Sequence, residues 1–137
     1  MGSWRNLVNI IIDIESARTV FSHLDFPLEV VDYNQGVDVL TGSGLIGQED
    51  NPVYKMYKVH GKGRECSSWD PIAFLYACGL YEDCFELSEF GKVIIEEKGL
   101  TNFMEKDGKH RLVYLKPEKK EKVKNIINDL FRRSMDI

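Results

Sequence analysis

The chain has 137 residues, of which 43% are hydrophobic and 29% are charged, which is enough to bury the core of one domain. Its net charge of −4, with no basic face, argues against a nucleic-acid partner. No stretch approaches the ~20 apolar residues of a membrane span, and the N-terminus lacks the layout of a signal peptide. We therefore expect a cytoplasmic protein without a membrane partner. Its three cysteines match no zinc motif.

The first quarter of the sequence has the pattern of a β-α-β unit. Residues 7–12 are nearly all apolar and β-branched, which is typical of a strand covered on both faces of a parallel sheet. Asp13 follows as a helix N-cap, and apolar side chains then recur at helical spacing as far as residue 24. Pro27 ends this pattern, and residues 28–31 indicate a second strand. We predict that the two strands are parallel and that their connection is right-handed.

The middle of the chain carries two pairs in which a capping residue precedes a proline. Asn51-Pro52 begins one predicted helix, and Asp70-Pro71 begins another, which Gly79 ends. The second helix is apolar on nearly every side, so we expect it to lie in the core. Two interpretations of Asp70 remain open: it is an N-cap only, or it is a cap that also binds a metal or a substrate.

The second half of the chain contains short strands and one long helix. Asp107-Gly108 is a hairpin signal, and a lysine-rich run over residues 116–124 alternates with acids like a solvated helix face. Residues 117–133 show a clear amphipathic pattern, and four strand candidates precede them: residues 84–87, 92–95, 101–104 and 111–115.

These elements together predict one α/β domain over residues 1–137. We expect a short parallel β-α-β core, a small antiparallel hairpin region and a C-terminal amphipathic helix.

The residue types argue against several common active sites. The chain has no G-x-S-x-G elbow, no P-loop, no metal-ligand spacing of Cys and His, and no carboxylates paired at helical spacing. Polar side chains remain at the ends of predicted elements: Asn9, Asp13, Asn34 and Asp70. Because strand ends form the ligand crevice of open α/β sheets, the residues alone predict an α/β domain with a polar site.

Several segments of the chain resemble, in the same order, segments of one enzyme family. Residues 9–17 resemble the family segment E-F-N-I-x-x-D-P-E-A-A, and residues 27–42 resemble its next strand and helix start. Residues 51–53 followed by Ser68-Trp69-Asp70-Pro71 resemble its Ser-Trp-Asp branch, and residues 108–111 resemble a late G-x-H-R turn. The family is the nucleoside hydrolases, the inosine-uridine preferring enzymes and their relatives, and the resemblance covers their C-terminal half.

The resemblance implies hydrolysis of the N-glycosidic bond of ribonucleosides, with Ca²⁺ holding the ribose diol and the attacking water. It implies that Asp70 is a metal ligand, that Asn9 binds the ribose, and that Trp69 lies beside the sugar or the base. Alternatively, Asn9 is a strand-end amide that satisfies the backbone, and Trp69 is a loop aromatic that fills the core.

Departures from the family pattern limit this interpretation. The family's Asp-x-Asp-x-x-x-Asp-Asp cluster, which supplies most metal ligands and the general base, is absent from the sequence. Leu7 replaces a ribose-binding glutamate, and Trp69 replaces a histidine that protonates the leaving base. We therefore assign no catalytic residue, and we expect Ca²⁺ to bind the isolated chain weakly or not at all.

Two functions follow as predictions. The first is that the chain is part of a calcium-dependent nucleoside N-ribohydrolase, inactive in isolation. The alternative is a non-catalytic α/β remnant or binding module. A sheet without its N-terminal half exposes an edge, so we also expect self-association or binding to a complementary N-terminal half.

Overall fold

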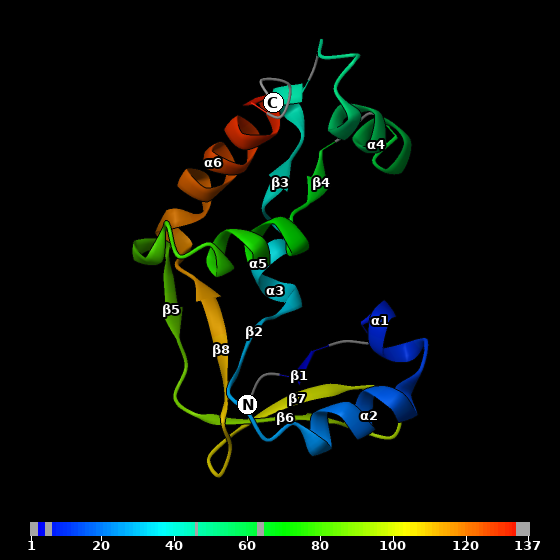
Figure 1. Cartoon of the computed structure of the whole chain (residues 1–137), viewed down its shortest axis with the longest axis vertical. Coiled ribbons are helices and arrows are strands. Elements are labelled where there is room, and N and C mark those ends of the chain that lie inside the picture. Colours follow the sequence, from blue (N-terminus) through cyan, green and yellow to red (C-terminus); the bar gives the residue numbers. More distant parts are fainter. Residues whose placement is uncertain (1–2, 5–6, 46, 63–64, 134–137) are drawn as a thin grey trace. The chain divides into compact units, whose positions relative to one another are not determined.

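A computed structural model describes residues 3–4, 7–45, 47–62 and 65–133 (Figure 1). The chain divides into two compact units, which are described separately. Unit 1 comprises Met1–Tyr33 and Leu87–Tyr114, and unit 2 comprises Asn34–Glu86 and Leu115–Ile137. Each unit is therefore built from two separate stretches of the sequence. Among the described residues, no helix is both long enough and apolar enough to span a membrane.

Unit 1 is organised around a mixed sheet with the strand order β1-β7-β6-β8-β2, and β5 also pairs with β8. β2 and β8 are parallel, whereas β6 and β7 form an antiparallel hairpin. The α/β class is confirmed, as are the predicted strand at residues 28–31 and the four C-terminal strands. The strands are β1 (Ser3–Trp4), β2 (Leu28–Val31), β5 (Phe85–Leu87), β6 (Gly91–Ile95), β7 (Thr101–Glu105) and β8 (His110–Leu115).

The predicted strand at residues 7–12 is wrong. Val8–Ile11 form the one-turn helix α1, which is followed at once by α2 (Ile14–His23). A short apolar run does not distinguish a strand from a helix by periodicity alone. The predicted N-cap is confirmed, because Oδ1 of Asp13 accepts a hydrogen bond from the Ser16 N–H at 2.9 Å.

The predicted β-α-β unit is consequently wrong as well. β2 has a parallel partner, but that partner is β8, with Leu28 opposite His110 and Val31 opposite Val113. The parallel pair therefore joins distant parts of the sequence rather than two strands connected by α2.

The Asp107-Gly108 turn does not join a hairpin, because β6 lies between β7 and β8 in the sheet. The hairpin of unit 1 is instead the β6–β7 pair, where the Glu96 N–H donates to the Leu100 carbonyl at 2.8 Å. The turn before β8 passes so close to β6 that a Cβ on Gly108 would lie 2.0 Å from the Gly91 carbonyl oxygen. Glycine is required there because of this close approach.

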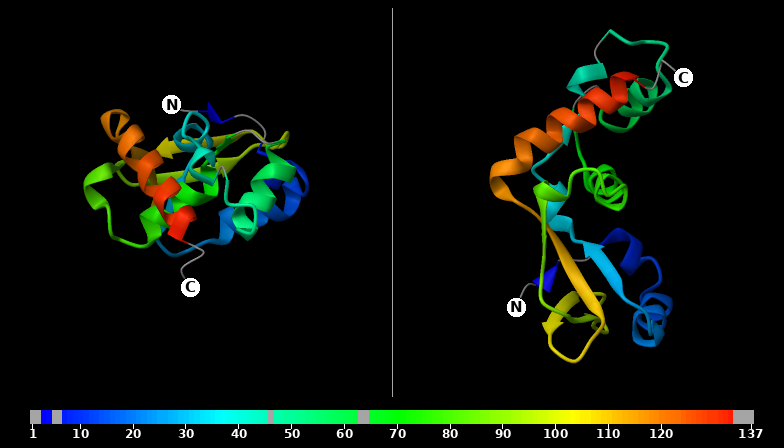
Figure 2. Two further views of the ribbon diagram at one scale, coloured as in Figure 1. Left: turned by 90° about the horizontal axis from the view of Figure 1, so that it is seen from above. Right: turned by 60° about the vertical axis from the view of Figure 1, so that its left-hand side comes forward.

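The core of unit 1 lies between the sheet and α2. Val93, Phe103 and Leu112 form a buried cluster, and Phe21 of α2 packs against it. Figures 1 and 2 show α2 running along β6. This packing explains the helical spacing of apolar residues in α2, whose other side faces solvent.

Unit 2 is mainly helical around a two-stranded antiparallel sheet of β3 and β4. The predicted C-terminal helix is confirmed, with a 3-10 turn before it, and the Asn51-Pro52 start is confirmed as well. The elements are α3 (Tyr33–Gly36), β3 (Leu40–Thr41), η1 (Ser43–Leu45), α4 (Pro52–His60), β4 (Cys66–Ser67), α5 (Trp69–Ala77), η2 (Glu82–Cys84), η3 (Pro117–Lys119) and α6 (Lys120–Arg133).

Buried polar side chains link the elements of unit 2. Oγ1 of Thr41 lies 2.6 Å from Oγ of Ser68 and 3.1 Å from the Tyr57 hydroxyl. Oδ1 of Asn128 accepts a hydrogen bond from the Gly42 N–H at 2.9 Å. Burial raises the pKa of the Tyr57 phenol, so the phenol keeps its proton at neutral pH. These contacts connect β3, α4, α6 and the N-cap of α5 around an apolar core of Val39, Leu45, Ile72, Leu75, Val123 and Ile127.

Candidate functional site

The first turn of α5 holds two of the residues singled out from the sequence. Trp69 and Asp70 are the first two residues of this helix, and its N-cap is Ser68. The N-cap prediction for Asp70 is therefore wrong. Its exposed carboxylate lies in the first turn instead, where the helix dipole favours a negative charge. The Ser68 side chain makes no capping bond, because its hydroxyl lies against Thr41.

The helix α5 is less completely buried than its apolar sequence predicts. Ile72 and Leu75 are buried, but Phe74 is 71% exposed, so only one side of the helix lies in the core. Trp69 is 39% exposed, and its Cδ1 would lie 2.8 Å from a Cβ placed on Gly36. Trp69 therefore packs partly against α3 and presents the rest of its surface to solvent.

Asn9 lies on α1 and is exposed. It belongs to unit 1, whereas Trp69 and Asp70 belong to unit 2, so the structure brings only the latter two together. No group of three His, Cys, Asp or Glu side chains suitable for a metal occurs in the described ranges. The predicted roles of Asn9, Trp69 and Asp70 remain predictions.

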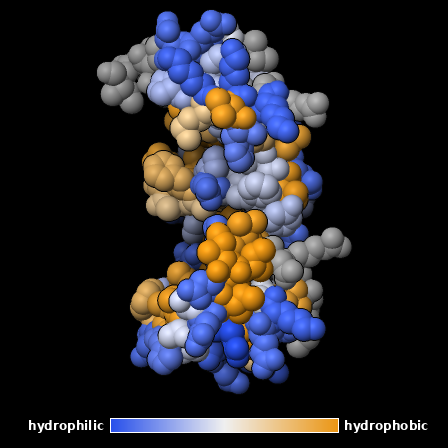
Figure 3. Space-filling model, turned by 90° about the vertical axis from the view of Figure 1, so that its right-hand side faces the viewer, coloured by the Kyte–Doolittle hydropathy of each residue, from blue (hydrophilic) through white to orange (hydrophobic). Residues whose placement is uncertain are grey.

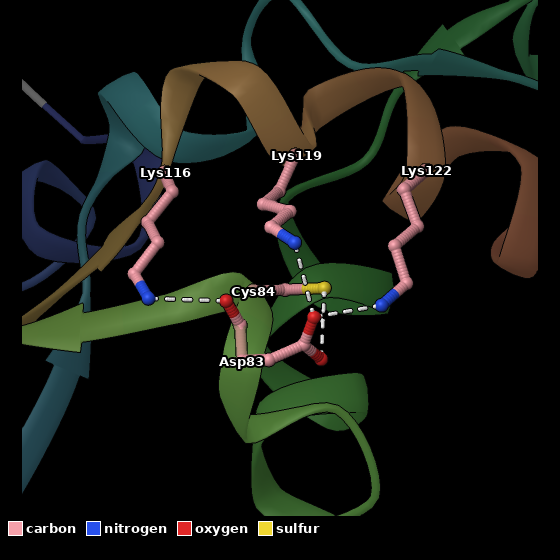
Figure 4. Close-up of polar contacts among 5 residues, drawn as sticks. All are labelled: Asp83, Cys84, Lys116, Lys119 and Lys122. Carbon is pink, nitrogen blue, oxygen red and sulfur yellow. Dashed lines mark hydrogen bonds and ion pairs between the residues drawn. The ribbon is translucent and has the colours of Figure 1, made fainter.

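The lysine-rich run at residues 116–124 has a structural role. Nζ of Lys119 and Nζ of Lys122 lie 3.2 and 2.8 Å from Oδ2 of Asp83, and Nζ of Lys116 donates to the Asp83 carbonyl at 3.1 Å (Figure 4). The hydrogen bonds from Lys122 and Lys119 lower the pKa of Asp83 to about 2. One carboxylate thus joins η2 to η3 and α6, which explains the lysine spacing of three residues.

A groove in unit 1 was missed by the sequence reasoning. It has a volume of about 490 Å³ and lies between α2 and β6. Lys92 and Ile94 line it together with Val93 and Ile95. Successive residues of a strand point to opposite faces of a sheet, so a groove lined by all four lies at an edge of the strand.

The hydrogen-bond pattern of the hairpin shows why this edge is open. Because Glu96 bonds to Leu100, the alternation of an antiparallel pair turns the N–H and C=O groups of Val93 and Ile95 away from β7. On that side β8 pairs with β6 only at Gly91, opposite His110. In the described part of the chain, no strand pairs with Ile95 on the side away from β7.

His110 closes one end of the open edge. Its ring is 2% exposed, and its Nδ1 accepts a hydrogen bond from the Val93 N–H at 3.1 Å. The ring also meets Phe21 edge-on, with the ring centroids 6.3 Å apart. Burial lowers the pKa of His110, and the positive charge of Lys92 lowers it further. His110 is therefore neutral at pH 7 and carries its proton on Nε2.

The charged residues of the groove come from both walls. Arg18 lies on α2 and Lys92 on β6, and neither forms an ion pair within the described residues. Neither of them was singled out from the sequence as a candidate site residue. No sequence signal would have brought them together, because the groove depends on the strand order β7-β6-β8.

Comparisons with known proteins found no match to this chain among family models, curated proteins or solved structures. Inferences about function therefore rest on the geometry of the two units.

Proposed function

We propose that the chain is a non-catalytic α/β binding module and that its ligand site is the groove between α2 and β6. The observation that carries this proposal is the open edge of β6 next to α2. The groove volume of about 490 Å³ falls within the range of small-molecule sites, roughly 300–1,000 Å³. Such sites combine an apolar lining with a few oriented polar groups.

The lining of the groove has this mixed character. Phe21, Ile94 and Met104 supply apolar surface, and Val93 and Ile95 are almost completely buried next to it. Thr19 and Ser22 supply hydroxyl groups from α2. The backbone groups of Ile95 that point away from β7 add a donor and an acceptor at fixed positions.

The occupant that fits is a small molecule rather than an added peptide strand. A further strand would have to lie ~4.8 Å from β6 along its open edge, and α2 contacts β6 beside this edge. Phe21 of α2 packs directly onto the Val93 cluster, so admitting a strand would require α2 to leave the core. A ligand in the existing groove requires no such movement.

Amide chemical shifts test this proposal. Fragment-sized compounds with apolar bodies should shift the amide signals of Thr19, Val93 and Ile95 in ¹⁵N-labelled protein. Thr19→Trp places a large ring in the groove and should abolish these shifts. Val20→Trp is the matched control, because Val20 is also exposed on α2 and does not line the groove. The absence of any groove-binding fragment, or binding unaffected by Thr19→Trp, would contradict the proposal.

The second candidate function is that the chain is part of a calcium-dependent nucleoside N-ribohydrolase. It is favoured by the exposure of both Trp69 and Asp70 on one helical turn, where a ring and a carboxylate are available to a ligand. We expect hydrolysis of p-nitrophenyl riboside by the isolated chain with Ca²⁺ to equal that of buffer. Calcium-dependent turnover that Asp70→Ala abolishes would overturn the non-catalytic proposal.

Self-association is proposed on the basis of an exposed apolar surface on α1. Val8 is 65%, Ile11 43% and Ile12 77% exposed, and Figure 3 shows a continuous hydrophobic patch on this part of unit 1. Apolar patches on a surface commonly mark interaction sites. Light scattering at high concentration should show species larger than a monomer, and Ile12→Lys should reduce them. A monomer at all concentrations would contradict self-association.

A further inference from the structure

The groove is lined by two cations that have no ion-pair partner within the described ranges, and they indicate what it binds. We infer that the groove binds a small amphiphilic anion, a carboxylate or phosphate group on a short apolar body, with Arg18 and Lys92 holding the anionic group. This inference rests on the proposed function and adds the chemical class of the ligand.

Two other cations of unit 1 form ion pairs, whereas Arg18 and Lys92, like Lys98 and Lys106, do not among the described residues. Lys109 lies 2.6 Å from Asp25, and Arg111 is paired with Glu29. Arg18 and Lys92 have no such partner among the residues that the structure describes. A guanidinium and an ammonium in the lining of one groove are both donors for charge-assisted hydrogen bonds with an anion.

The position of Lys92 is supported by its effect on His110. The charge of the ammonium lowers the pKa of the buried imidazole, which lies at the end of the groove beside Phe21. Glu15 is the carboxylate in the lining, one turn before Arg18, and the lining still carries an excess of positive charge.

The remaining groups of the groove fit the two ends of such a ligand. The Ile95 N–H points away from β7 and is a donor for an anionic oxygen, as backbone N–H groups are in many anion sites. Phe21, Ile94 and Met104 offer apolar surface for a short hydrocarbon body. The site is therefore suited to an anion with a hydrophobic part rather than to a free inorganic ion.

A titration with four compounds tests this inference. Hexanoate, hexyl phosphate and hexanol carry alkyl bodies of five or six carbons, and inorganic phosphate has none. Binding is followed by the amide shifts of Val93 and Ile95 at low ionic strength. We expect the two organic anions to bind about tenfold more tightly than hexanol, because a charge-assisted hydrogen bond adds roughly that factor. Inorganic phosphate should bind more weakly than hexyl phosphate, and the two organic anions show which head group the site prefers.

Charge-removing variants identify the residues responsible. Arg18→Gln and Lys92→Gln should each lower the affinity for the organic anions about threefold, since the two cations share the tenfold contribution of charge, while leaving hexanol unaffected. Glu15→Gln should raise the affinity for anions. Lys98→Gln is the matched control, because it removes the same charge from an exposed position of unit 1 outside the groove.

The outcomes separate this inference from the function on which it rests. Equal affinity for hexanol and hexanoate, or no effect of Arg18→Gln and Lys92→Gln, would overturn the anion inference while leaving the groove as a ligand site. Absence of shifts with all four compounds, together with no hit among neutral fragments, would overturn both.

Discussion

His110 offers the sharpest test of the unit 1 structure, because one hydrogen bond that its ring accepts from Val93 continues the β6–β8 contact beyond Gly91. Nδ1 accepts the Val93 N–H at 3.1 Å in a site where the ring is 2% exposed. His110→Phe keeps an aromatic ring beside Phe21 but leaves a buried N–H without an acceptor. The expected loss of unfolding free energy is about 2 kcal/mol, within the ~1–3 kcal/mol cost of an unsatisfied buried polar group.

The same residue predicts an acid-sensitive stability. The folded state lowers the pKa of His110 below its ordinary value of 6.5, so the unfolded chain binds a proton more readily. Stability is therefore full above pH 6.5 and falls as the pH drops toward the folded-state pKa, by at most about 1.4 kcal/mol per pH unit. Below the folded-state pKa the loss levels off.

Urea unfolding between pH 5 and 8 measures both effects, and hydrogen exchange of the Val93 amide reports the local bond. His110→Asn is the informative companion, because its Oδ1 takes the place of Nδ1 as acceptor without titrating. This variant should keep the Val93 amide protected from hydrogen exchange. The decrease in stability at acidic pH that His110 causes should disappear. A combined His23→Gln and His60→Gln variant controls for the exposed histidines. Wild-type stability of His110→Phe at pH 8, or an unchanged pH dependence in both His110 variants, would refute the reasoning.

Three further substitutions test unit 2. Asn51 caps α4 by accepting from the Val53 N–H at 2.8 Å, and its Nδ2 donates to the Phe131 carbonyl at 3.1 Å. Asn51→Ala should therefore lower the free energy of unfolding by urea by about 2–3 kcal/mol, and Gln48→Ala should cause a smaller loss. Gly42 has φ +115°, and a Cβ there would lie 2.4 Å from the Tyr57 ring. Gly42→Ala should therefore lower the free energy of unfolding by about 2 kcal/mol or more. Gly47→Ala is the control and should cost less, because a Cβ at Gly47 meets no neighbouring atom. The lowered pKa of Asp83 means that its stabilising effect is present above pH 3.8 and disappears as the pH falls to about 2. Asp83→Asn should therefore reduce stability at neutral pH, less so in high salt, and the difference from wild type should vanish near pH 2.

The sequence predicted correctly those elements whose signals lie within a few neighbouring residues. It failed where contacts with distant residues determine the structure. Asp13 and Asn51 mark helix starts through bonds to the next few residues, so both were correct. The pattern of residues 117–133 extends over several turns and was also correct. The short apolar run at residues 7–12 has too few residues to reveal its period, and α1 formed in place of a strand.

The order of the strands in the sheet accounts for the remaining differences between the predictions and the structure. The Asp107-Gly108 turn looks local, but β6 occupies the position beside β7 that the hairpin prediction gave to β8. The groove depends on that same order, because among the described strands it leaves Ile95 without a partner on one side. Asp70 was misplaced for a related reason: Ser68 is held by Thr41 from another segment, which sets the helix start two residues earlier.

The interleaving of the two units has a consequence for biosynthesis. β2 pairs with residues that lie 82 positions later, as the Glu29–Arg111 contact shows, and unit 2 needs α6 from the end of the described chain. During translation, β2 and the other early segments therefore remain without their partners until most of the polypeptide has emerged from the ribosome. We expect nascent chains stalled before β8 to be protease-sensitive throughout and to engage chaperones, because neither half of the molecule can fold ahead of the other.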